Sequence, residues 1–220
     1  MNLAAQIVGL AHRALAPWGE LGFEVLLQRS LLGELPAAAA GVPATIRLAV
    51  AEDIDTITRL YSSDPWLYLG KGPPTPENLA TARELYLDRL RRGELCYLAL
   101  CRDAIAHVNW SCFAWGDALP NHPIRLRAGE VFTTDALTLP AFRGRGLHAF
   151  VLRAMLAHAR ERGCRHAYTL GRVDRSASFQ GLTQLGWQIC GRVVYFQPRG
   201  RDDDWLLWRQ GKVEPLFRPA

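Results

Sequence analysis

Two arginines and two glycines alternate just before an apolar-periodic segment, within the stretch Thr138–Leu156. They are Arg143, Gly144, Arg145 and Gly146, and a β-like segment precedes them. Unpaired N–H groups and the positive end of the helix dipole make a helix N-terminus attractive to anions. Glycine lets the backbone approach an anion closely, and arginine donates charge-assisted hydrogen bonds to phosphate oxygens. The stretch therefore predicts a pyrophosphate-binding turn at the start of a helix.

The turn resembles the coenzyme A-binding turn of the GNAT N-acetyltransferase superfamily. In that family the pattern Arg/Gln-x-x-Gly-x-Gly/Ala follows a strand and opens a helix. Here, after Pro140, the pattern is Arg143-x-x-Gly146-x-His148, so a histidine replaces the small residue at the last position. The order of elements from Thr45 to about residue 210 also fits the family, so the resemblance covers about three quarters of the chain.

A second stretch, RSASFQGLTQLGWQICGR, resembles the family segment that follows its fifth strand. Ser178 and the run Leu185–Trp187 match the family pattern. Arg175 stands where asparagine is usual. Leu182 stands where many members have the tyrosine that protonates the leaving thiolate. The resemblance therefore implies the fold more firmly than it implies the complete catalytic set.

Other interpretations of the turn are a solvated basic loop and a dinucleotide-binding turn, because Gly144-x-Gly146-x-x-Ala149 has the glycine spacing of the latter. A dinucleotide site needs an acidic residue about 20 positions on, at the end of the next strand. The expected strand 166–172 ends without a carboxylate, and Asp174 comes too late. An RGG-type nucleic-acid tract would repeat, and this sequence has one copy. The coenzyme A interpretation is preferred.

The resemblance implies that acetyl-CoA or another acyl-CoA is the co-substrate and that no metal is needed. In the family, the strand before the turn pairs its backbone with the pantetheine arm, and the turn holds the pyrophosphate. The residues expected to bind the cofactor are Leu137, Thr138, Leu139, Arg143, Gly144, Arg145, Gly146, Leu147, His148 and Ser178.

Acyl transfer to an amine is helped by a base, because the acceptor must be neutral when it attacks. The candidates are Asp135 and Glu130, both on the strand before the turn. Strand alternation puts them on opposite faces, so only one can face the acceptor unless a bulge intervenes. Asp135 is preferred from the family position. Tyr195 and Tyr168 are the candidates to replace the missing general acid.

Aromatic residues indicate where an acceptor could bind. Trp66 and Tyr68 lie in the loop that borders the acceptor in the family, and Trp110 lies on the third expected strand beside Asn109. Aromatic faces next to an amide could stack a sugar ring, while packing in the core is the alternative. We list all four as candidate substrate-binding residues.

The elements that must position these residues follow from hydrophobic periodicity and turn signals. They predict an α/β fold with a mixed, partly antiparallel central sheet flanked by helices. Expected strands are 45–50, 94–101, 104–114, 130–139, 166–172, 187–197 and 204–210, and expected helices are 51–63, 77–93, 147–163 and 176–186.

Residues 1–35 are interpreted as two short helices broken at Pro17, with a linker that ends near residue 44. The expected organisation is therefore a helical extension and linker over 1–44, an acyltransferase domain over 45–212 and a tail over 213–220. The helical extension would pack on the domain or on a second subunit, which leaves a homodimer open. It is net acidic, which disfavours a membrane-surface helix.

Composition bounds the function classes. The chain has 220 residues, 49% of them hydrophobic, and a formal net charge of +5. This charge suits a small anionic ligand, whereas a nucleic-acid interface would show a dense basic stripe. The five cysteines include no C-x-x-C pair, so neither a disulfide framework nor a zinc site is expected. The longest apolar runs are too short for a membrane span, and a cytoplasmic location is expected.

The sequence thus predicts an enzyme that transfers an acetyl or short acyl group from acyl-CoA to a small acceptor. The acceptor is expected to be an amine, and a sugar could carry it. The alternative is a module of the same fold that binds acyl-CoA without turnover, which the missing tyrosine at Leu182 favours.

Overall fold

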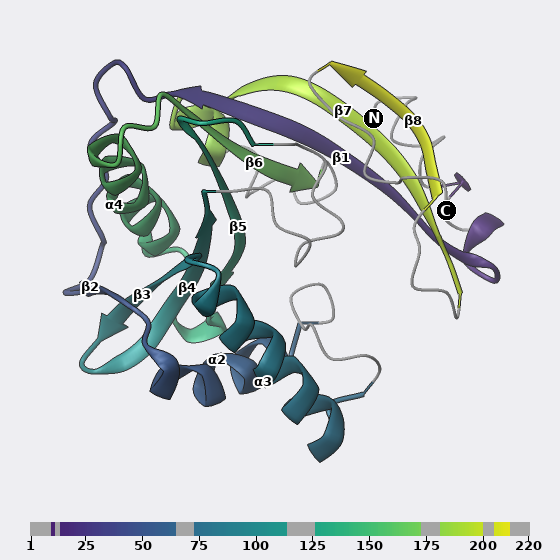
Figure 1. Ribbon diagram of the computed structural model, residues 1–220, viewed down its shortest axis with the longest axis horizontal. Helices are drawn as coiled ribbons and strands as arrows, with labels where there is room; N and C mark the ends of the chain where they lie inside the picture. The colour runs from purple at the N-terminus through teal and green to yellow at the C-terminus, as the bar shows by residue number, and fades with distance from the viewer. Residues whose placement is uncertain are drawn as a thin grey trace. The chain divides into compact units, whose positions relative to one another are not determined.

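The computed structural model of the chain describes residues 10–11, 14–64, 73–113, 126–172, 181–199 and 205–211. Within them the chain forms two compact units. The eight strands are divided between these units (Figure 1). Strand β6 (His166–Arg172) belongs to both, because the division falls between Tyr168 and Thr169.

The larger unit contains the arginine–glycine turn. Its strands lie in the order β2-β3-β4-β5-β6, and the pairs from β2 to β5 are antiparallel. The first residues of β5 and β6 lie next to each other. Arg165, just before β6, donates its N–H to the carbonyl of Gly129, just before β5, at 2.7 Å. Its elements before β6 are β2 (Thr45–Leu48), η1 (Ala51–Asp53), α2 (Ile54–Tyr61), α3 (Pro76–Arg91), β3 (Leu95–Cys101), β4 (Ala104–Cys112), β5 (Glu130–Thr138), η2 (Pro140–Phe142) and α4 (Leu147–Glu161). The mixed α/β fold expected from the sequence is confirmed.

Helices cover both faces of this part of the sheet. Side chains alternate along a strand, so neighbouring residues of β4 face opposite helices. Val108 and Trp110 pack with residues of α2 and α3 in one hydrophobic core. On the other face, the Tyr97 hydroxyl lies 2.7 Å from Nδ1 of His158 on α4. Figure 1 shows α4 across the strands from α2 and α3.

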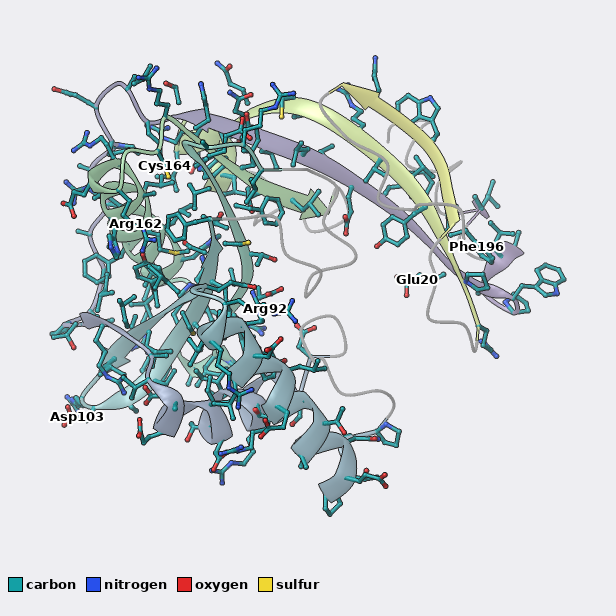
Figure 2. All side chains as sticks on the ribbon, in the orientation of Figure 1. Glu20, Arg92, Asp103, Arg162, Cys164 and Phe196 are labelled. Carbon is teal, nitrogen blue, oxygen red and sulfur yellow. The ribbon has the colours of Figure 1, made fainter. Side chains whose placement is uncertain are left out.

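The hairpin between β3 and β4 turns at Arg102 and Asp103, as the sequence predicts. Both have positive φ, at 48° and 64°, which is the backbone of a type I′ turn. Figure 2 labels Asp103 at this tip. The hairpin places β4 in the centre of the unit, beside β5.

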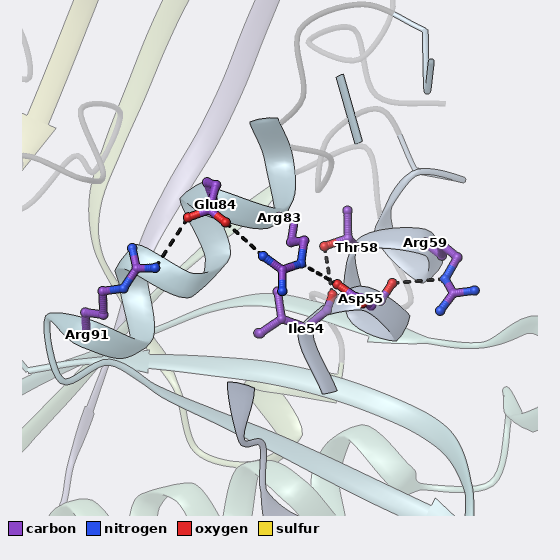
Figure 3. Close-up of polar contacts among 7 residues, drawn as sticks. All are labelled: Ile54, Asp55, Thr58, Arg59, Arg83, Glu84 and Arg91. Atoms are coloured by element: carbon purple, nitrogen blue, oxygen red, sulfur yellow. Dashed lines mark hydrogen bonds and ion pairs between the residues drawn. The ribbon is translucent and has the colours of Figure 1, made fainter. Parts of the chain in front are cut away.

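Exposed ion pairs join α2 to α3 on the outer surface (Figure 3). Arg83 Nε on α3 lies 2.5 Å from Oδ1 of Asp55 on α2, and its Nη1 lies 2.8 Å from Oε1 of Glu84. Arg91 reaches the other oxygen of Glu84 at 3.3 Å. Exposed pairs of this kind stabilise little. The packing of the two helices therefore depends on their buried faces.

The smaller unit corrects the expected N-terminal helical extension. Residues 10, 11, 14 and 15 are helical, but Gly19–Ser30 is a strand, β1. It pairs antiparallel with β7 (Gln188–Pro198) from Gly19 opposite Pro198 to Gln28 opposite Gln188. β8 (Trp205–Gly211) pairs with the other edge of β7, and the order is β6-β1-β7-β8.

Burial along β1 explains why its sequence resembles that of a helix. Leu21, Val25, Leu26 and Leu27 are all buried, and a bulge interrupts the pairing between Leu26 and Leu27. A bulged strand shows no simple alternation of apolar and polar residues.

No helix in the described part of the chain is both long and apolar enough to cross a membrane.

Candidate functional site

The turn leads into α4 through two glycines with left-handed backbone. Gly144 and Gly146 have φ of +73° and +70°, a region that favours glycine. Gly146 is the N-cap residue, and no side chain caps this helix. The first bond of the helix runs from Phe150 N–H to the Gly146 carbonyl at 3.0 Å. The N–H groups of residues 147–149 therefore have no acceptor within the helix and could bind an anion.

Both arginines of the turn are exposed. Arg143 Nε donates to the carbonyl of Thr138 at 3.2 Å, which fixes the guanidinium at the end of β5. This bond uses one of the five N–H donors of an arginine. The guanidinium carbon of Arg145 lies 5.7 Å from the ring centroid of Phe142. The turn thus carries two cationic side chains beside the start of a helix, an arrangement that suits a phosphate.

The linker before β2 packs against the back of the turn. Gly41 N–H donates to the Arg145 carbonyl at 2.8 Å. A Cβ atom on Gly146 would lie 3.0 Å from the carbonyl oxygen of Ala39. Substituting Gly146 would therefore disturb the linker and strain the backbone at the same time. Changes at the arginines test ligand binding more cleanly.

A histidine stack lies beneath the turn. His148, in the first turn of α4, stacks on His107 of β4 with ring centroids 5.5 Å apart. His107 Nδ1 lies 2.7 Å from the Thr138 hydroxyl oxygen, and the residue is fully buried. Burial lowers the pKa of both histidines, and the neighbouring His148 further lowers the pKa of His107, to about 3. We infer that His107 is neutral and couples the turn to β4 and β5.

The low pKa of His107 predicts a loss of stability in acid. The unfolded chain takes up a proton near pH 6.5, whereas the folded chain does so near pH 3, so stability falls as the pH drops between these values. The contribution is about 1.5 kcal/mol between about pH 6.5 and pH 5. Urea unfolding over this range should show a shallower pH dependence in His107→Gln than in the wild type. Equal slopes would contradict the assignment of a neutral buried histidine.

A bulge interrupts the pairing of β4 with β5 just before the turn. Val108 is opposite Leu137, and Trp110 is opposite Thr134, so Asp135 and its neighbour Ala136 share the place opposite one residue of β4. Asp135 has φ of +56°, which is uncommon for a residue other than glycine. Backbone groups at a bulge leave the regular ladder and are free to bind something else.

The two candidate carboxylates of β5 have different surroundings. Glu130 is buried at the start of the strand, where its oxygens accept bonds from Arg127 N–H at 2.9 Å and the Tyr168 hydroxyl at 3.2 Å. Asp135 lies at the bulge, and its side chain is 21% exposed. Its Oδ2 accepts a bond from Arg89 Nη1 at 2.6 Å. The bulge thus removes the simple alternation that placed the two carboxylates on opposite faces.

Of the two residues considered for the general acid, Tyr195 lies in the smaller unit and Tyr168 in the larger one, where its hydroxyl donates to Oε1 of Glu130 at 3.2 Å. The Tyr195 hydroxyl donates to Oε1 of Glu24 at 3.3 Å. Its ring lies over Gly22 of β1, where a Cβ atom would overlap it. Leu182, at the position of the family's usual tyrosine, is buried and only 4% exposed. The described contacts of Tyr195 are those of a strand residue packed on its neighbour.

The residues expected to bind an acceptor are only partly described. Asn109 and Trp110 are 1% and 0% exposed. The Trp110 ring stacks on Tyr86 at 6.2 Å, and the Arg89 guanidinium lies 4.1 Å from its centroid. Such burial suits a core role better than the stacking of a sugar. Trp66, Tyr68 and Ser178 lie outside the described residues.

Residues expected to contact the pantetheine arm follow the bulge. Leu137 is buried in the core with α2 and α3, and Thr138 pairs with His107. Leu139 N–H donates to the Ala106 carbonyl at 3.0 Å, so its N–H is already used by β4.

The described part of the chain shows no group of three or more His, Cys, Asp and Glu side chains that could hold a metal ion.

Sequence reasoning missed Arg89 and Tyr61, which surround the bulge. Arg89 is 1% exposed and Tyr61 is 0% exposed. A signal for Arg89 existed: Ala82, Tyr86 and Arg89 follow the i, i+4, i+7 spacing of one helix face.

A scan against protein-family models gave no match, and a search of curated proteins likewise gave none. Solved structures do match. A GNAT-family acetyltransferase from Colwellia psychrerythraea superposes with a TM-score of 0.58 at 14% identity, covering 90% of this chain and 62% of that one. The tandem GNAT protein of the clavulanic acid biosynthesis pathway gives a TM-score of 0.56 at 16% identity, over 89% of this chain and 59% of that one.

A smaller protein matches over most of its own length. It comes from Clostridium acetobutylicum, is described as a predicted acetyltransferase and was solved with acetyl-CoA. The TM-score is 0.50 at 16% identity, over 66% of this chain and 90% of that one. At these identities the matches show the fold, which is that of GNAT acetyltransferases.

Proposed function

Because the chain has the GNAT fold, we propose that it is an acyltransferase that binds acyl-CoA at the turn Arg143–His148. It would move an acetyl or short acyl group to a small acceptor, with an amine as the preferred class. The observation that carries the proposal is the uncapped N-terminus of α4, preceded by two glycines with positive φ and two exposed arginines. This arrangement suits a pyrophosphate.

The turn offers two kinds of donor to the pyrophosphate. The N–H groups of residues 147–149 would bind one phosphate, aided by the dipole of a helix of 15 residues. The guanidinium of Arg143, already fixed by its bond to Thr138, would bind a phosphate oxygen at a lower entropic cost than a free side chain. His148, in place of the family's small residue, packs inward on His107 and so leaves the outer side of the turn to the ligand.

The bulge of β5 is the proposed site of acyl transfer. An amine nitrogen attacks the thioester carbonyl carbon and forms the new C–N bond; the C–S bond then breaks, the amine loses a proton and the thiolate of CoA gains one. Negative charge develops on the carbonyl oxygen during the attack, and backbone N–H groups stabilise such an oxyanion. Backbone groups near Asp135 and Ala136 are suited to this because the bulge takes them out of the ladder.

The alternative function is that of a binding module that holds acyl-CoA without turnover. Its support is that Asp135 already pairs with Arg89 and that Leu182 occupies the position of the family's usual tyrosine. The two functions share the turn and differ at the bulge.

Thiol release distinguishes them. Acetyl-CoA is incubated with the protein and a library of amines, amino sugars included, and free CoA thiol is measured together with the mass of the acetylated product. The enzyme predicts thiol release that depends on one class of amine and matches the product in amount. Tight binding of CoA without release from any amine would favour the binding module, and absence of CoA binding would reject both.

A further inference from the structure

Arg89 is a buried cation that the turn does not use. It lies on α3, is 1% exposed, and is among the largest fully buried side chains of the described residues. Its Nε donates to Oε2 of Glu94 at 2.9 Å, and its Nη1 donates to Oδ2 of Asp135 at 2.6 Å. Its guanidinium also lies over the Trp110 ring, 4.1 Å from the centroid. A buried charge is costly unless it is paired, so this position is built around its partners.

The partners keep Arg89 charged. Burial by itself lowers the pKa of the guanidinium, but the attraction of Asp135 and Glu94 outweighs it, and the net effect is a raised pKa. Burial also raises the pKa of the Glu94 carboxyl, against the effect of Arg89. The contact between Arg89 and Asp135 is therefore a charge-assisted hydrogen bond inside the protein, which is stronger and more directional than a neutral one.

Asp135 is held at three points. Its carboxylate accepts the bond from Arg89 on Oδ2 and one from the Thr134 hydroxyl at 3.1 Å on Oδ1. Its carbonyl oxygen accepts a bond from the hydroxyl of Tyr61, on α2, at 2.5 Å. These contacts come from α2, α3 and β5 and converge on the one residue of the bulge with positive φ.

The contacts to Asp135 offset the strain of its left-handed backbone. A residue other than glycine in the left-handed region is strained by about 1–3 kcal/mol, and such strain persists only where the surroundings over-determine it. Aspartate tolerates this backbone better than most residues. Without the contacts from Tyr61 and Arg89, β5 could relax toward a regular ladder with β4, and the backbone groups freed by the bulge would be paired again.

We propose that Arg89 is a positioning residue for acyl transfer: together with Tyr61 it locks the bulge of β5, and Asp135 is the anchored group. Arg89 and Thr134 each donate to one carboxylate oxygen of Asp135, and the role that we assign to this carboxylate is to hold the backbone of the bulge, in place of taking the proton of the acceptor. The inference rests on the proposed acyl transfer at this strand.

The first test compares two tyrosine-to-phenylalanine variants. Tyr61→Phe removes only the hydroxyl that binds the Asp135 carbonyl. Tyr97→Phe removes a hydroxyl bond of similar length, 2.7 Å, on the opposite face of the sheet, to His158. We expect kcat to fall about tenfold in Tyr61→Phe, with the KM for acetyl-CoA within about twofold and the pH profile unchanged, whereas Tyr97→Phe keeps both constants. Equal kcat in the two variants would overturn the proposal.

The second test separates anchoring from base catalysis at Asp135. Asparagine tolerates positive φ and can still accept a bond from Arg89, whereas alanine can do neither. Anchoring predicts that kcat in Asp135→Asn stays within about tenfold of the wild type and that Asp135→Ala loses considerably more. A general base contributes about 100- to 10,000-fold, so base catalysis predicts comparable losses above a hundredfold in both variants. That second pattern would overturn the proposal.

Hydrogen exchange gives a readout that does not need turnover. Arg89→Lys keeps the charge but cannot span Glu94 and Asp135 with a planar fork. Amide exchange of residues 136–138 should rise at least tenfold in Arg89→Lys and in Tyr61→Phe, and should be unchanged in Tyr97→Phe. Unchanged exchange in all three would overturn the lock, whether or not the wild type acetylates an amine. Raised exchange in a protein without wild-type turnover would instead reject the proposed function and keep the lock.

Discussion

Replacing Arg143 with alanine is expected to weaken the binding of CoA at least tenfold. A hydrogen bond to a charged group contributes about 1.5–3 kcal/mol, which corresponds to roughly 10- to 150-fold in affinity. The effect should be strong because the side chain is already fixed by its bond to the Thr138 carbonyl at 3.2 Å. Calorimetric titration with CoA measures it, and the loss should shrink at high salt because the contact is ionic.

Two further variants test whether the loss of affinity comes from the Arg143 guanidinium itself. Arg143→Lys keeps the charge but lacks the Nε donor that reaches Thr138, so its loss should lie between those of the wild type and Arg143→Ala. Arg153 is an exposed arginine further along α4, and Arg153→Ala changes the net charge equally at a distance from the turn. Equal losses in Arg143→Ala and Arg153→Ala would mean that general charge, and no built site, attracts CoA.

Replacing Gly22 with valine is expected to destabilise the smaller unit by about 3 kcal/mol or more. Gly22 on β1 faces Tyr195 on β7, and its missing side chain makes room for the aromatic ring. Any Cβ atom there would overlap the ring, so either Tyr195 must turn away or the strands must separate. Overpacking usually costs about 1–3 kcal/mol, and loss of the Tyr195–Glu24 hydrogen bond adds to it.

The chain offers a matched control for this change. Gly33 has no atom within 4 Å of an added Cβ, and its neighbourhood is open. Thermal and urea unfolding should therefore show a large loss of stability for Gly22→Val and little change for Gly33→Val. A Gly22→Val variant as stable as the wild type would contradict the pairing of β1 with β7.

Much of the larger unit could be predicted because its signals are local. The turn at Arg102 and Asp103 separates two β-rich runs, and the periodic segment after Gly146 is long enough to identify a helix. β1 could not be recognised in the same way, because its partner β7 lies more than 150 residues further along the chain. A mostly buried, bulged strand also has an apolar pattern that periodicity alone does not distinguish from a helix.

The candidate site likewise has a part that depends on local sequence and a part that depends on distant contacts. The turn before α4 is formed by glycines and arginines that are adjacent in sequence, so its backbone conformation and its position at the start of a helix could be predicted. The bulge depends on contacts that Asp135 makes with Tyr61 and Arg89, 74 and 46 residues away. Without them Asp135 looks like an ordinary strand carboxylate with a free side chain. The sequence could therefore single out Asp135 as a candidate, but it could not predict the contacts that surround it.

The most direct test of the central claim is amide hydrogen exchange of the segment Arg143–Phe150 with and without CoA. The account predicts that saturating CoA slows exchange of the N–H groups at residues 147–149, since these would donate to the pyrophosphate. Pantetheine, which lacks the pyrophosphate, should leave this segment unchanged. CoA binding that protects other parts of the chain but not the start of α4 would contradict the account.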